Sequence, residues 1–326
     1  MIGIEKPRFV LVRRIKPGNE VISLANAWGF YFLGLKNGEL KKFNPDWNEV
    51  DVLKTNGQIR GIAPAGDRIF LTSWDKNIYC VGRDMKELWK KQVDSFPFGI
   101  SAGKNFVVYT TNSGTLGALD YEGRPLWEKK FEGSLECVRV SNEKIYTGTY
   151  KGEAIVLDAG GNTLWTFNCN DMVRSICIGK QFYVYTTATG RVFMFRDDGT
   201  MYWVQQEPSP SLVSDATENC IAVGFFNNSI LFFDRIGKVV QRVEETTRPN
   251  AILFRDSTTF ITGSQWVNIY QNFPDENVEI LFEVMCIGGK CGTFISAELL
   301  DACPQCGSEK IISRVVEERR FTKEFD

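Results

Sequence analysis

Apolar and polar residues alternate in short runs along most of the chain, and turns rich in glycine, asparagine and aspartate separate the runs. Alternate side chains of a β-strand face opposite sides of a sheet, so each run predicts a short strand. Gly190 and Gly199 mark two of the turns, because glycine adopts the positive φ angle that tight turns require. Together the runs predict a meander of four antiparallel strands. The runs of one such unit are residues 175–178, 182–187, 191–196 and 201–205.

This four-stranded unit repeats every 38 residues. A turn position that is often glycine recurs at this spacing in seven copies, from Gly38 to Trp266. Seven four-stranded units of about 40 residues are typical of a β-propeller. We therefore predict an all-β, seven-bladed propeller in which the tryptophans of the fourth strands cover the contacts between neighbouring blades. Five aligned segments show the 38-residue spacing and end at Trp89, Trp127, Trp165, Trp203 and Gln241.

The segment Ala118–Trp127 has the pattern ALD-x-x-G-x-x-LW, and Val156–Trp165 has it with valine as its first residue. This pattern resembles the repeats of the PQQ-like (quinoprotein-type) propellers over roughly residues 9–284. That family includes quinoprotein dehydrogenases and non-enzymatic assembly scaffolds. The dehydrogenases usually have eight blades and are exported, and we find no residue set here that matches their quinone and calcium sites. The resemblance therefore implies the fold and not the cofactor.

The repeat divides the chain into two predicted domains. Residues 1–284 form the propeller, and residues 285–326 form a small C-terminal module with its tail. An open propeller leaves unpaired strand edges, so a segment from one end of the repeat region is expected to complete the last blade. The N-terminal run at about residues 9–14 is the favoured closing strand, and residues 278–285 are the alternative.

Four of the nine cysteines lie in the C-terminal module, as two close pairs about a dozen residues apart. This arrangement is typical of a structural tetrahedral zinc site. The module resembles the zinc-ribbon (rubredoxin-like) modules, although its first pair has the spacing C-x4-C rather than C-x2-C. We predict one structural Zn²⁺, with metal-free thiols and iron as the alternatives. The predicted ligands are Cys286, Cys291, Cys303 and Cys306.

The composition narrows the possible chemistry. The chain contains no histidine, which excludes Ser-His-Asp and Cys-His nucleophiles and every histidine-ligated metal. An odd number of cysteines and the lack of an apolar leader argue against a disulfide framework and for a cytoplasmic protein. No run approaches the roughly 20 apolar residues that span a bilayer. A net charge of −2 gives no sign of a surface for polyanions.

Large aromatic residues at the predicted blade tips are candidate partner-binding residues. They lie on one face of the propeller, here called the top face, which carries the outer-to-inner strand loops and the turns between second and third strands. Such rings often anchor interfaces, and nearby arginines supply polar pairing. The alternative is that the rings fold back as local core. The full set is Trp74, Phe96, Phe98, Tyr150, Phe226, Trp266, Arg60, Arg174 and Arg248.

These features favour a non-catalytic scaffold that binds other protein subunits of a larger complex through the top face and the zinc ribbon. One alternative is an enzyme or cofactor binder that uses the central channel, where Arg139, Cys177 and Asp215 share an inner-strand position. The other is a nucleic-acid- or ribosome-associated factor. Nucleic acid is the less favoured partner, and no membrane contact is predicted. The basic residues that suggest the last alternative are Lys6, Arg8, Arg13, Arg14 and Lys16.

Overall fold

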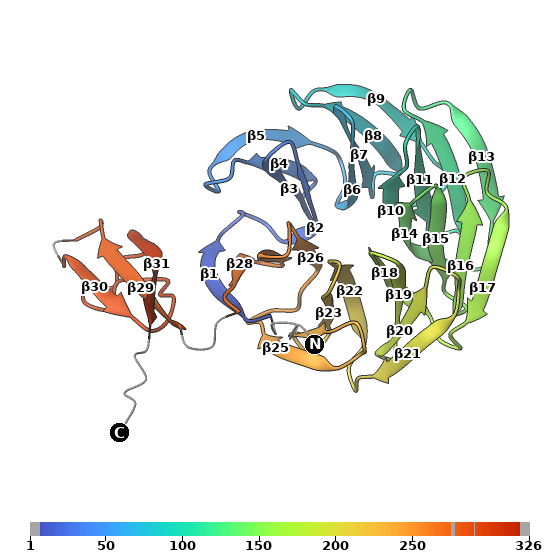
Figure 1. The fold of residues 1–326 in the computed structure, drawn as a ribbon. Coiled ribbons are helices and arrows are strands. Elements are labelled where there is room, and N and C mark those ends of the chain that lie inside the picture. The colour runs from blue at the N-terminus through green and yellow to red at the C-terminus, as the bar shows by residue number, and fades with distance from the viewer. Residues whose placement is uncertain (1–6, 275–277, 290, 320–326) are drawn as a thin grey trace.

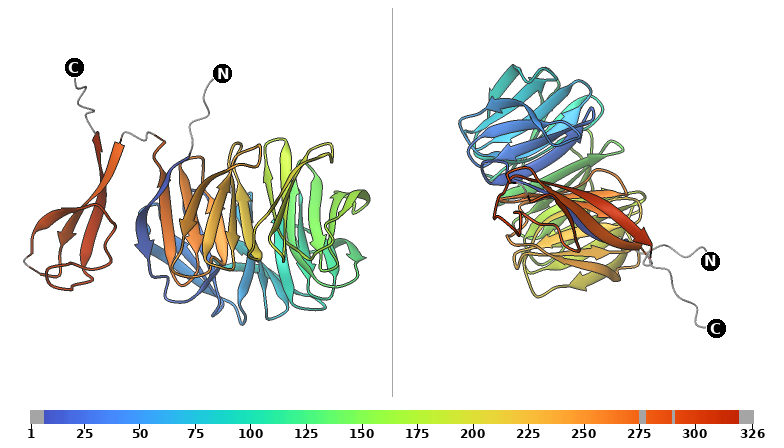
Figure 2. Two further views of the ribbon diagram at one scale, coloured as in Figure 1. Left: turned by 90° about the horizontal axis from the view of Figure 1, so that it is seen from below. Right: turned by 90° about the vertical axis from the view of Figure 1, so that its left-hand side faces the viewer.

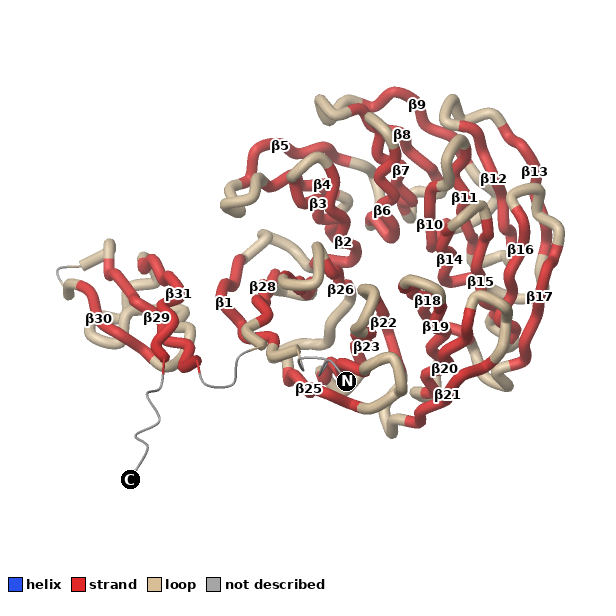
Figure 3. Tube along the Cα trace, viewed as in Figure 1, coloured by secondary structure: helices blue, strands red, loops and turns tan. Residues whose placement is uncertain are grey.

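The molecule consists of strands and loops (Figure 3). The computed structural model describes residues 7–274, 278–289 and 291–319, which contain 31 strands and no helix. The all-β prediction is confirmed. Within this described part of the chain, no helix is available to cross a membrane. Lys6 and the tail from residue 320 onwards, which were included in the sequence predictions, lie outside the described residues.

Seven four-stranded antiparallel sheets surround a common axis (Figure 1), so the seven-bladed propeller is confirmed. In blades one to six, four consecutive strands pair in chain order, from the axis to the rim. Blades one to three consist of β2 (Val21–Ala27), β3 (Phe30–Leu35), β4 (Glu39–Phe43) and β5 (Glu49–Lys54); β6 (Ile59–Ala65), β7 (Arg68–Ser73), β8 (Asn77–Gly82) and β9 (Glu87–Gln92); and β10 (Pro97–Ala102), β11 (Phe106–Thr111), β12 (Thr115–Asp120) and β13 (Pro125–Lys130). Blades four to six consist of β14 (Leu135–Ser141), β15 (Lys144–Thr149), β16 (Glu153–Asp158) and β17 (Thr163–Asn168); β18 (Val173–Gly179), β19 (Phe182–Thr187), β20 (Arg191–Arg196) and β21 (Met201–Gln206); and β22 (Ser211–Ala216), β23 (Ile221–Phe225), β24 (Ser229–Phe233) and β25 (Val239–Glu244).

The seventh blade combines strands from both ends of the propeller sequence. Its outermost strand is the N-terminal one, which runs antiparallel to its neighbour with Phe9 opposite Asn272. Its innermost strand contacts β2 of blade one, and the Val21 N–H donates a hydrogen bond of 2.7 Å to the Ser264 carbonyl. The first and last blades are therefore in direct contact. From the rim inward, the strands of blade seven are β1 (Phe9–Ile15), β28 (Val267–Asn272), β27 (Thr259–Gly263) and β26 (Ala251–Phe254).

The outer-strand tryptophans join neighbouring blades. The ring of Trp127 in blade three lies over Gly161 of blade four, and its Nε1–H donates a hydrogen bond of 2.8 Å to the Ala159 carbonyl. Gly161 has a φ of 84°, and a methyl group there would lie 3.1 Å from the Trp127 ring, so both backbone and packing require glycine. The same two contacts connect Trp89 to Tyr121 and Gly123, and Trp203 to Arg235 and Gly237.

The aspartate of the repeated motif fixes the turn that carries this glycine. The Asp158 carboxylate accepts a hydrogen bond of 2.8 Å from the Asn162 N–H, and the Asp158 carbonyl accepts one of 3.0 Å from the Gly161 N–H. Aspartate side chains commonly cap tight turns in this way. Each residue type of the motif therefore has a place in the contact between blades: aspartate forms the turn, glycine leaves space, and tryptophan covers the next glycine along the ring.

A separate three-stranded sheet follows the propeller. It consists of β29 (Val278–Cys286), β30 (Thr293–Ser296) and β31 (Ile311–Arg319), in the order β30-β29-β31. β29 pairs with β31 along its whole length, from Val278 opposite Arg319 to Cys286 opposite Ile311. This strand crosses the boundary expected between residues 284 and 285. Residues 278–285 thus belong to the C-terminal sheet, and the outer position of blade seven is held by β1.

The C-terminal sheet lies at the rim of the propeller beside β1, rather than over either end of the axis (Figures 1 and 2). Val10 and Val12 of β1 pack against the apolar core of this sheet, which includes Phe282 and Val284. Two ion pairs flank the apolar contact, Arg14 with Asp301 at 2.6 Å and Lys16 with Glu309 at 3.6 Å. β1 therefore contributes to both domains, as the outer strand of one and as a packing surface for the other.

Replacing Trp127 with alanine is expected to lower the free energy of unfolding by about 2–4 kcal/mol, because a large ring and its hydrogen bond leave the seam between blades three and four. Leu126→Ala is the matched control, since Leu126 precedes it on the same strand and is 53% exposed. The midpoint of thermal unfolding, followed by circular dichroism, measures the difference. Equal midpoints for the two variants would contradict the assigned role of the tryptophan.

Candidate functional sites: the axial cavity and the cysteine cluster

A β-bulge interrupts the inner strand of each of blades one to six. In blade two the bulge leaves Arg60 without a partner between Ile59 and Gly61, which pair with Ser73 and Thr72. A bulge bends its strand and redirects one side chain. The bulge residues line a cavity on the propeller axis. They are Ile22, Arg60, Phe98, Glu136, Arg174 and Leu212.

This axial cavity has a volume of about 740 Å³ and is lined by residues from all seven blades. Lys36, Trp74 and Phe226 are among the lining residues, and each lies at the turn between the second and third strands of its blade. The cavity therefore opens on the top face. Its size falls within the range of sites that bind small molecules or parts of larger ones, roughly 300–1,000 Å³.

A repeated backbone hydrogen bond holds the tip of each of blades one to six at this opening. The Trp74 N–H donates to the Gln58 carbonyl at 2.9 Å, and the Phe226 N–H donates to the Pro210 carbonyl at the same distance. The acceptor in each case precedes the inner strand of the same blade. Because this hydrogen bond involves only backbone atoms, the side chain at the tip can differ from blade to blade.

Three predicted residues form one cluster beside the cavity mouth. The guanidinium of Arg60 lies 5.3 Å from the ring centre of Trp74 and 5.1 Å from that of Phe98. Phe96 also contacts this cluster, with its ring centre 6.0 Å from that of Trp74. Burial lowers the pKa of Arg60, the nearby Glu136 carboxylate raises it, and the charge of Arg174 lowers it again. Arginine keeps its charge in such surroundings.

The other two predicted arginines also lie at the cavity. Arg174 donates a hydrogen bond of 2.8 Å from Nη1 to the Glu136 carboxylate. Arg248 lies over the ring of Phe226 at 5.0 Å, on a different part of the rim. The structure thus places all three arginines, together with Trp74, Phe98 and Phe226, around one cavity.

Tyr150 and Trp266 lie outside this cavity lining. Tyr150 is at the tip of blade four and is 59% exposed. Trp266 lies at the tip of blade seven, where the Lys16 ammonium is 4.9 Å and the Arg14 guanidinium 5.7 Å from its ring centre. Since Arg14 and Lys16 also pair with the C-terminal sheet, Trp266 belongs to the junction of the two domains.

The inner-strand position shared by Arg139, Cys177 and Asp215 is largely engaged in structural contacts. Burial and the charge of Asp215 raise the pKa of Cys177 to about 12, so its thiol stays protonated near neutral pH. The Asp215 carboxylate accepts a hydrogen bond of 2.7 Å from the Phe254 N–H and so ties blade six to blade seven. Burial raises the pKa of Asp215, while this hydrogen bond and Arg139 lower it.

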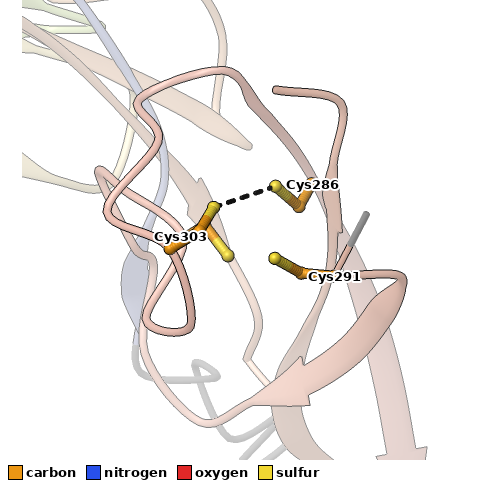
Figure 4. A group of neighbouring side chains, drawn as sticks. Cys286, Cys291 and Cys303 are labelled. Atoms are coloured by element: carbon orange, nitrogen blue, oxygen red, sulfur yellow. Dashed lines mark hydrogen bonds between the residues drawn. The ribbon is translucent and has the colours of Figure 1, made fainter. Parts of the chain in front are cut away.

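The four predicted metal ligands come together at one end of the C-terminal sheet. The Sγ atoms of Cys286, Cys291, Cys303 and Cys306 all lie within 4.8 Å of one another, and Figure 4 shows the labelled sulfurs directed toward a common centre. The Cys286 and Cys306 sulfurs are 3.7 Å apart. A tetrahedral Zn²⁺ with bonds of about 2.3 Å separates its sulfurs by about 3.8 Å, so the donor set fits this ion.

The strands and turns of the sheet explain how the thiols meet. Cys286 ends β29, and the two loops that flank β30 bring the other three cysteines beside it. Burial opposes ionisation of Cys303, but the backbone N–H groups of Gln305 and Cys306 donate to its sulfur and lower its pKa to about 7. A hydrogen bond with the Cys306 sulfur, together with burial, raises the pKa of Cys291 to about 12. A divalent cation at the centre favours the thiolate form of all four.

Gly289 leaves the space that the cluster needs. A methyl group at this position would lie 3.2 Å from the Cys306 sulfur, 3.5 Å from the Cys291 sulfur and 3.6 Å from the Cys286 sulfur. Gly307 follows the second cysteine pair with a φ of 71°, and its N–H donates to the Cys303 carbonyl at 2.8 Å. Both glycines therefore serve the close approach of the loops, the first by its size and the second by its conformation.

Sequence reasoning missed the acidic residues of the cavity. Glu136 pairs with Arg174, and Glu20 pairs with Lys36 at 2.7 Å while also accepting a hydrogen bond from Asn250. The sequence does indicate that Glu136 lies at the cavity, because it is one repeat before Arg174 and two repeats after Arg60. Applying the period to charged residues, and not only to aromatic ones, would have found it.

Comparison with known proteins supports a PQQ-like propeller repeat. A family model described as "Outer membrane protein assembly factor BamB" matches residues 112–249. Two curated proteins named lambda-carrageenase, from Pseudoalteromonas sp and Pseudoalteromonas carrageenovora, are each 20% identical over 163 residues, which is 48% of this chain and 14% of theirs. The chain therefore matches only a small part of those relatives.

A solved structure, that of the computationally designed Ika8 protein, is similar with a TM-score of 0.65 at 13% sequence identity. The match covers 80% of this chain and 98% of the designed one. At this level of identity the likeness concerns the fold alone.

Replacing Glu136 with glutamine is expected to lower the free energy of unfolding by about 1–3 kcal/mol, because Arg174 loses its charged partner and two guanidinium groups are left near each other. Glu132→Gln is the control: its carboxylate pairs with Lys151 at the surface and is 80% exposed, so its loss should cost within about 0.5 kcal/mol. Thermal unfolding compares the variants, and a stable Glu136→Gln protein would argue against a structural role for the pair.

Proposed function

We propose that the chain is a non-catalytic interaction scaffold that binds other protein subunits through the top face of the propeller and through the C-terminal sheet. The observation that carries the proposal is the set of exposed rings on the top face. Trp74 and Phe96 are each 40% exposed, and Phe226 is 54% exposed. Together with Tyr150 they occupy the tips of blades two, three, four and six. Exposed rings on one face are typical of partner-binding surfaces.

The surrounding chemistry supports binding rather than catalysis. The chain has no histidine, and the burial that keeps Cys177 protonated removes it as a nucleophile. The family model that matches part of the propeller carries the name of an assembly factor, whereas the carrageenases, which are enzymes by name, share only a small part of their length with this chain. A cytoplasmic location stays a prediction from the sequence.

Two other functions remain as alternatives. The axial cavity favours a cofactor or small ligand as the second candidate, and an absorbance spectrum of the purified protein with a quinone-like band would support it. The nucleic-acid alternative rests on the basic residues near the N-terminus. Arg14 and Lys16 of this group are paired with Asp301 and Glu309, which makes them less available to phosphates.

In this proposal the C-terminal sheet is a zinc ribbon that holds one structural Zn²⁺ on Cys286, Cys291, Cys303 and Cys306. Four thiolates fill a tetrahedral coordination shell, so the ion supplies folding energy rather than a reaction site. The sulfur spacing and the space beside Gly289 support this assignment. The small apolar core shared with β1 gives the sheet little other stabilisation.

The scaffold proposal predicts that exchanging Trp74, Phe96, Tyr150 and Phe226 together for serine removes most protein partners in affinity purification from the native host. The reason is that exposed aromatic rings are the usual anchors of protein interfaces. The control exchanges Leu88, Leu126 and Leu164 for serine, which are also more than half exposed but lie on outer strands. Recovery of the wild-type chain alone, or the same partners with both variants, would contradict the proposal.

The zinc assignment predicts about one Zn²⁺ per freshly purified chain by elemental analysis, and a loss of at least tenfold in zinc retention in Gly289→Ala. The added methyl group would lie 3.2 Å from the Cys306 sulfur, closer than an ordinary contact, and so displace this ligand from tetrahedral spacing. Ile287→Ala serves as the control, because Ile287 is an exposed neighbour in the same loop. A coloured chelator follows zinc release. Unchanged release from Gly289→Ala, or zinc-free wild-type protein, would contradict the assignment.

A further inference from the structure

The charge of the axial cavity is opposite in sign to that of the whole chain. The chain carries a net charge of −2, whereas the cavity lining contains five basic and two acidic residues. A cleft lined by charges of one sign concentrates ions of the other sign. The basic residues are Lys36, Arg60, Arg139, Arg174 and Arg248, and the acidic ones are Glu20 and Glu136.

The two acidic residues neutralise two of the five positive charges. Glu20 pairs with Lys36 at 2.7 Å and Glu136 pairs with Arg174 at 2.8 Å. Among the described residues, the guanidinium groups of Arg60, Arg139 and Arg248 have no ion-pair partner within 4.0 Å. The cavity therefore has an unbalanced positive charge that favours an anionic ligand.

Arg60 is the best-positioned of these groups. The rings of Trp74 and Phe98 hold its guanidinium in place by contacts of 5.3 Å and 5.1 Å. Its Nε is buried and makes no hydrogen bond to any described residue, and the same is true of the Nε of Arg174. Buried polar groups are nearly always hydrogen-bonded in proteins. Two buried donors without acceptors, on the inner strands of blades two and five, indicate a ligand in the cavity that supplies the acceptors.

The geometry of the donors favours a carboxylate. A guanidinium presents its N–H groups as a planar fork that matches the two oxygens of a carboxylate. Glu136 already accepts one hydrogen bond of 2.8 Å from Nη1 of Arg174 inside the cavity. Arg60, Glu136 and Arg174 together carry a single positive charge, which one carboxylate neutralises. A phosphate group, with a charge of about −1.5 to −2, would exceed the single positive charge of these three residues.

The mouth of the cavity indicates how the carboxylate arrives. Exposed rings of Trp74 and Phe226 border the opening on the top face, and each has an arginine beside it. An extended chain segment with acidic and apolar residues fits both features, because its acidic side chains reach the arginines while its apolar ones contact the rings. We infer that the axial cavity binds carboxylate groups of an acidic segment in a partner protein, with Arg60 as the main binding group. This inference rests on the proposed scaffold function.

The test uses the full-length protein and a fluorescein-labelled hexaglutamate peptide, with fluorescence polarisation as the readout. Wild-type protein is expected to bind the peptide, and Arg60→Met to weaken binding at least tenfold because the guanidinium fork is lost. Arg60→Lys keeps the charge without the fork and should weaken binding at least threefold. Lys151→Met is the control, since Lys151 is a basic top-face residue that pairs with Glu132, and it should bind within twofold of wild type.

Three competitors are compared with unlabelled hexaglutamate to identify the class of ligand. Tricarballylate, a free tricarboxylate, should displace the peptide at least tenfold less effectively than unlabelled hexaglutamate, and inorganic phosphate and a ten-nucleotide RNA should be weaker still. Stronger displacement by tricarballylate would overturn the assignment to a protein segment. Preference for phosphate or RNA would overturn the carboxylate assignment. The inference as a whole would be overturned if the wild-type protein failed to bind hexaglutamate, or if both Arg60 variants bound it as tightly as the wild type.

The two proposals fail in different ways. If affinity purification recovers partners that the four-ring variant loses, while hexaglutamate does not bind, the scaffold stands and the cavity inference is wrong. If hexaglutamate binds in an Arg60-dependent way but no partner is recovered from the host, carboxylate binding stands, and both the scaffold and the assignment to a partner segment are wrong. Far-UV circular dichroism of each variant excludes misfolding as the cause of lost binding. If Arg60→Met fails to fold, the binding measured for Arg60→Lys tests the role of the guanidinium group instead.

Discussion

Contacts between an outer-strand tryptophan and a glycine of the next blade join blades two to six of this propeller. A four-stranded blade alone exposes both of its faces, and it becomes stable only when neighbours cover them. The Trp127 ring over Gly161 covers one such seam, and its hydrogen bond to Ala159 fixes the angle between blades. Trp89 and Trp203 make the same contact with the blade that comes next in the chain. Because these contacts lie near the outer strands, the inner ends of the strands are not needed to join the blades. They can therefore carry other types of residue.

The bulges of the inner strands allow residues of different types to face the axis. A regular strand would alternate its side chains between two blade faces, and no side chain would point along the radius to the axis. In blades one to six the bulge redirects one residue into the cavity, where the repeat no longer dictates its type. Arg60, Phe98, Glu136 and Arg174 occupy equivalent positions in consecutive blades and include basic, aromatic and acidic side chains. A uniform outer framework thus supports a varied inner ring, which is the arrangement that a binding site on a repeat protein requires.

The sequence predicted the regular parts of the fold well. Residues 182–187 and 191–196 were expected as strands, and they are β19 and β20 with the same ends. The four cysteines were expected to meet, since their spacing leaves few other arrangements, and they do.

The parts that depend on contacts between distant elements were not predictable in the same way. The Glu136–Arg174 pair depends on two bulges that the alternation of residues does not indicate. The position of Trp266 depends on β1 lying beside it, more than 250 residues away in the chain. The continuation of β29 through residue 284 depends on β31 as its partner.

β1 precedes every other described strand in the chain, whereas its partner β28 is the last strand of the propeller. About 250 residues separate it from β28, and at about 5–20 residues per second a ribosome takes roughly 13–50 s to make them. During this time the N-terminal strand has an open edge that can pair with another chain. Arg13 and Arg14 place two positive charges in that strand, and charges of this kind oppose edge-to-edge association. The arginine that later joins the C-terminal sheet through Asp301 thus also protects the nascent chain before either of its partners exists.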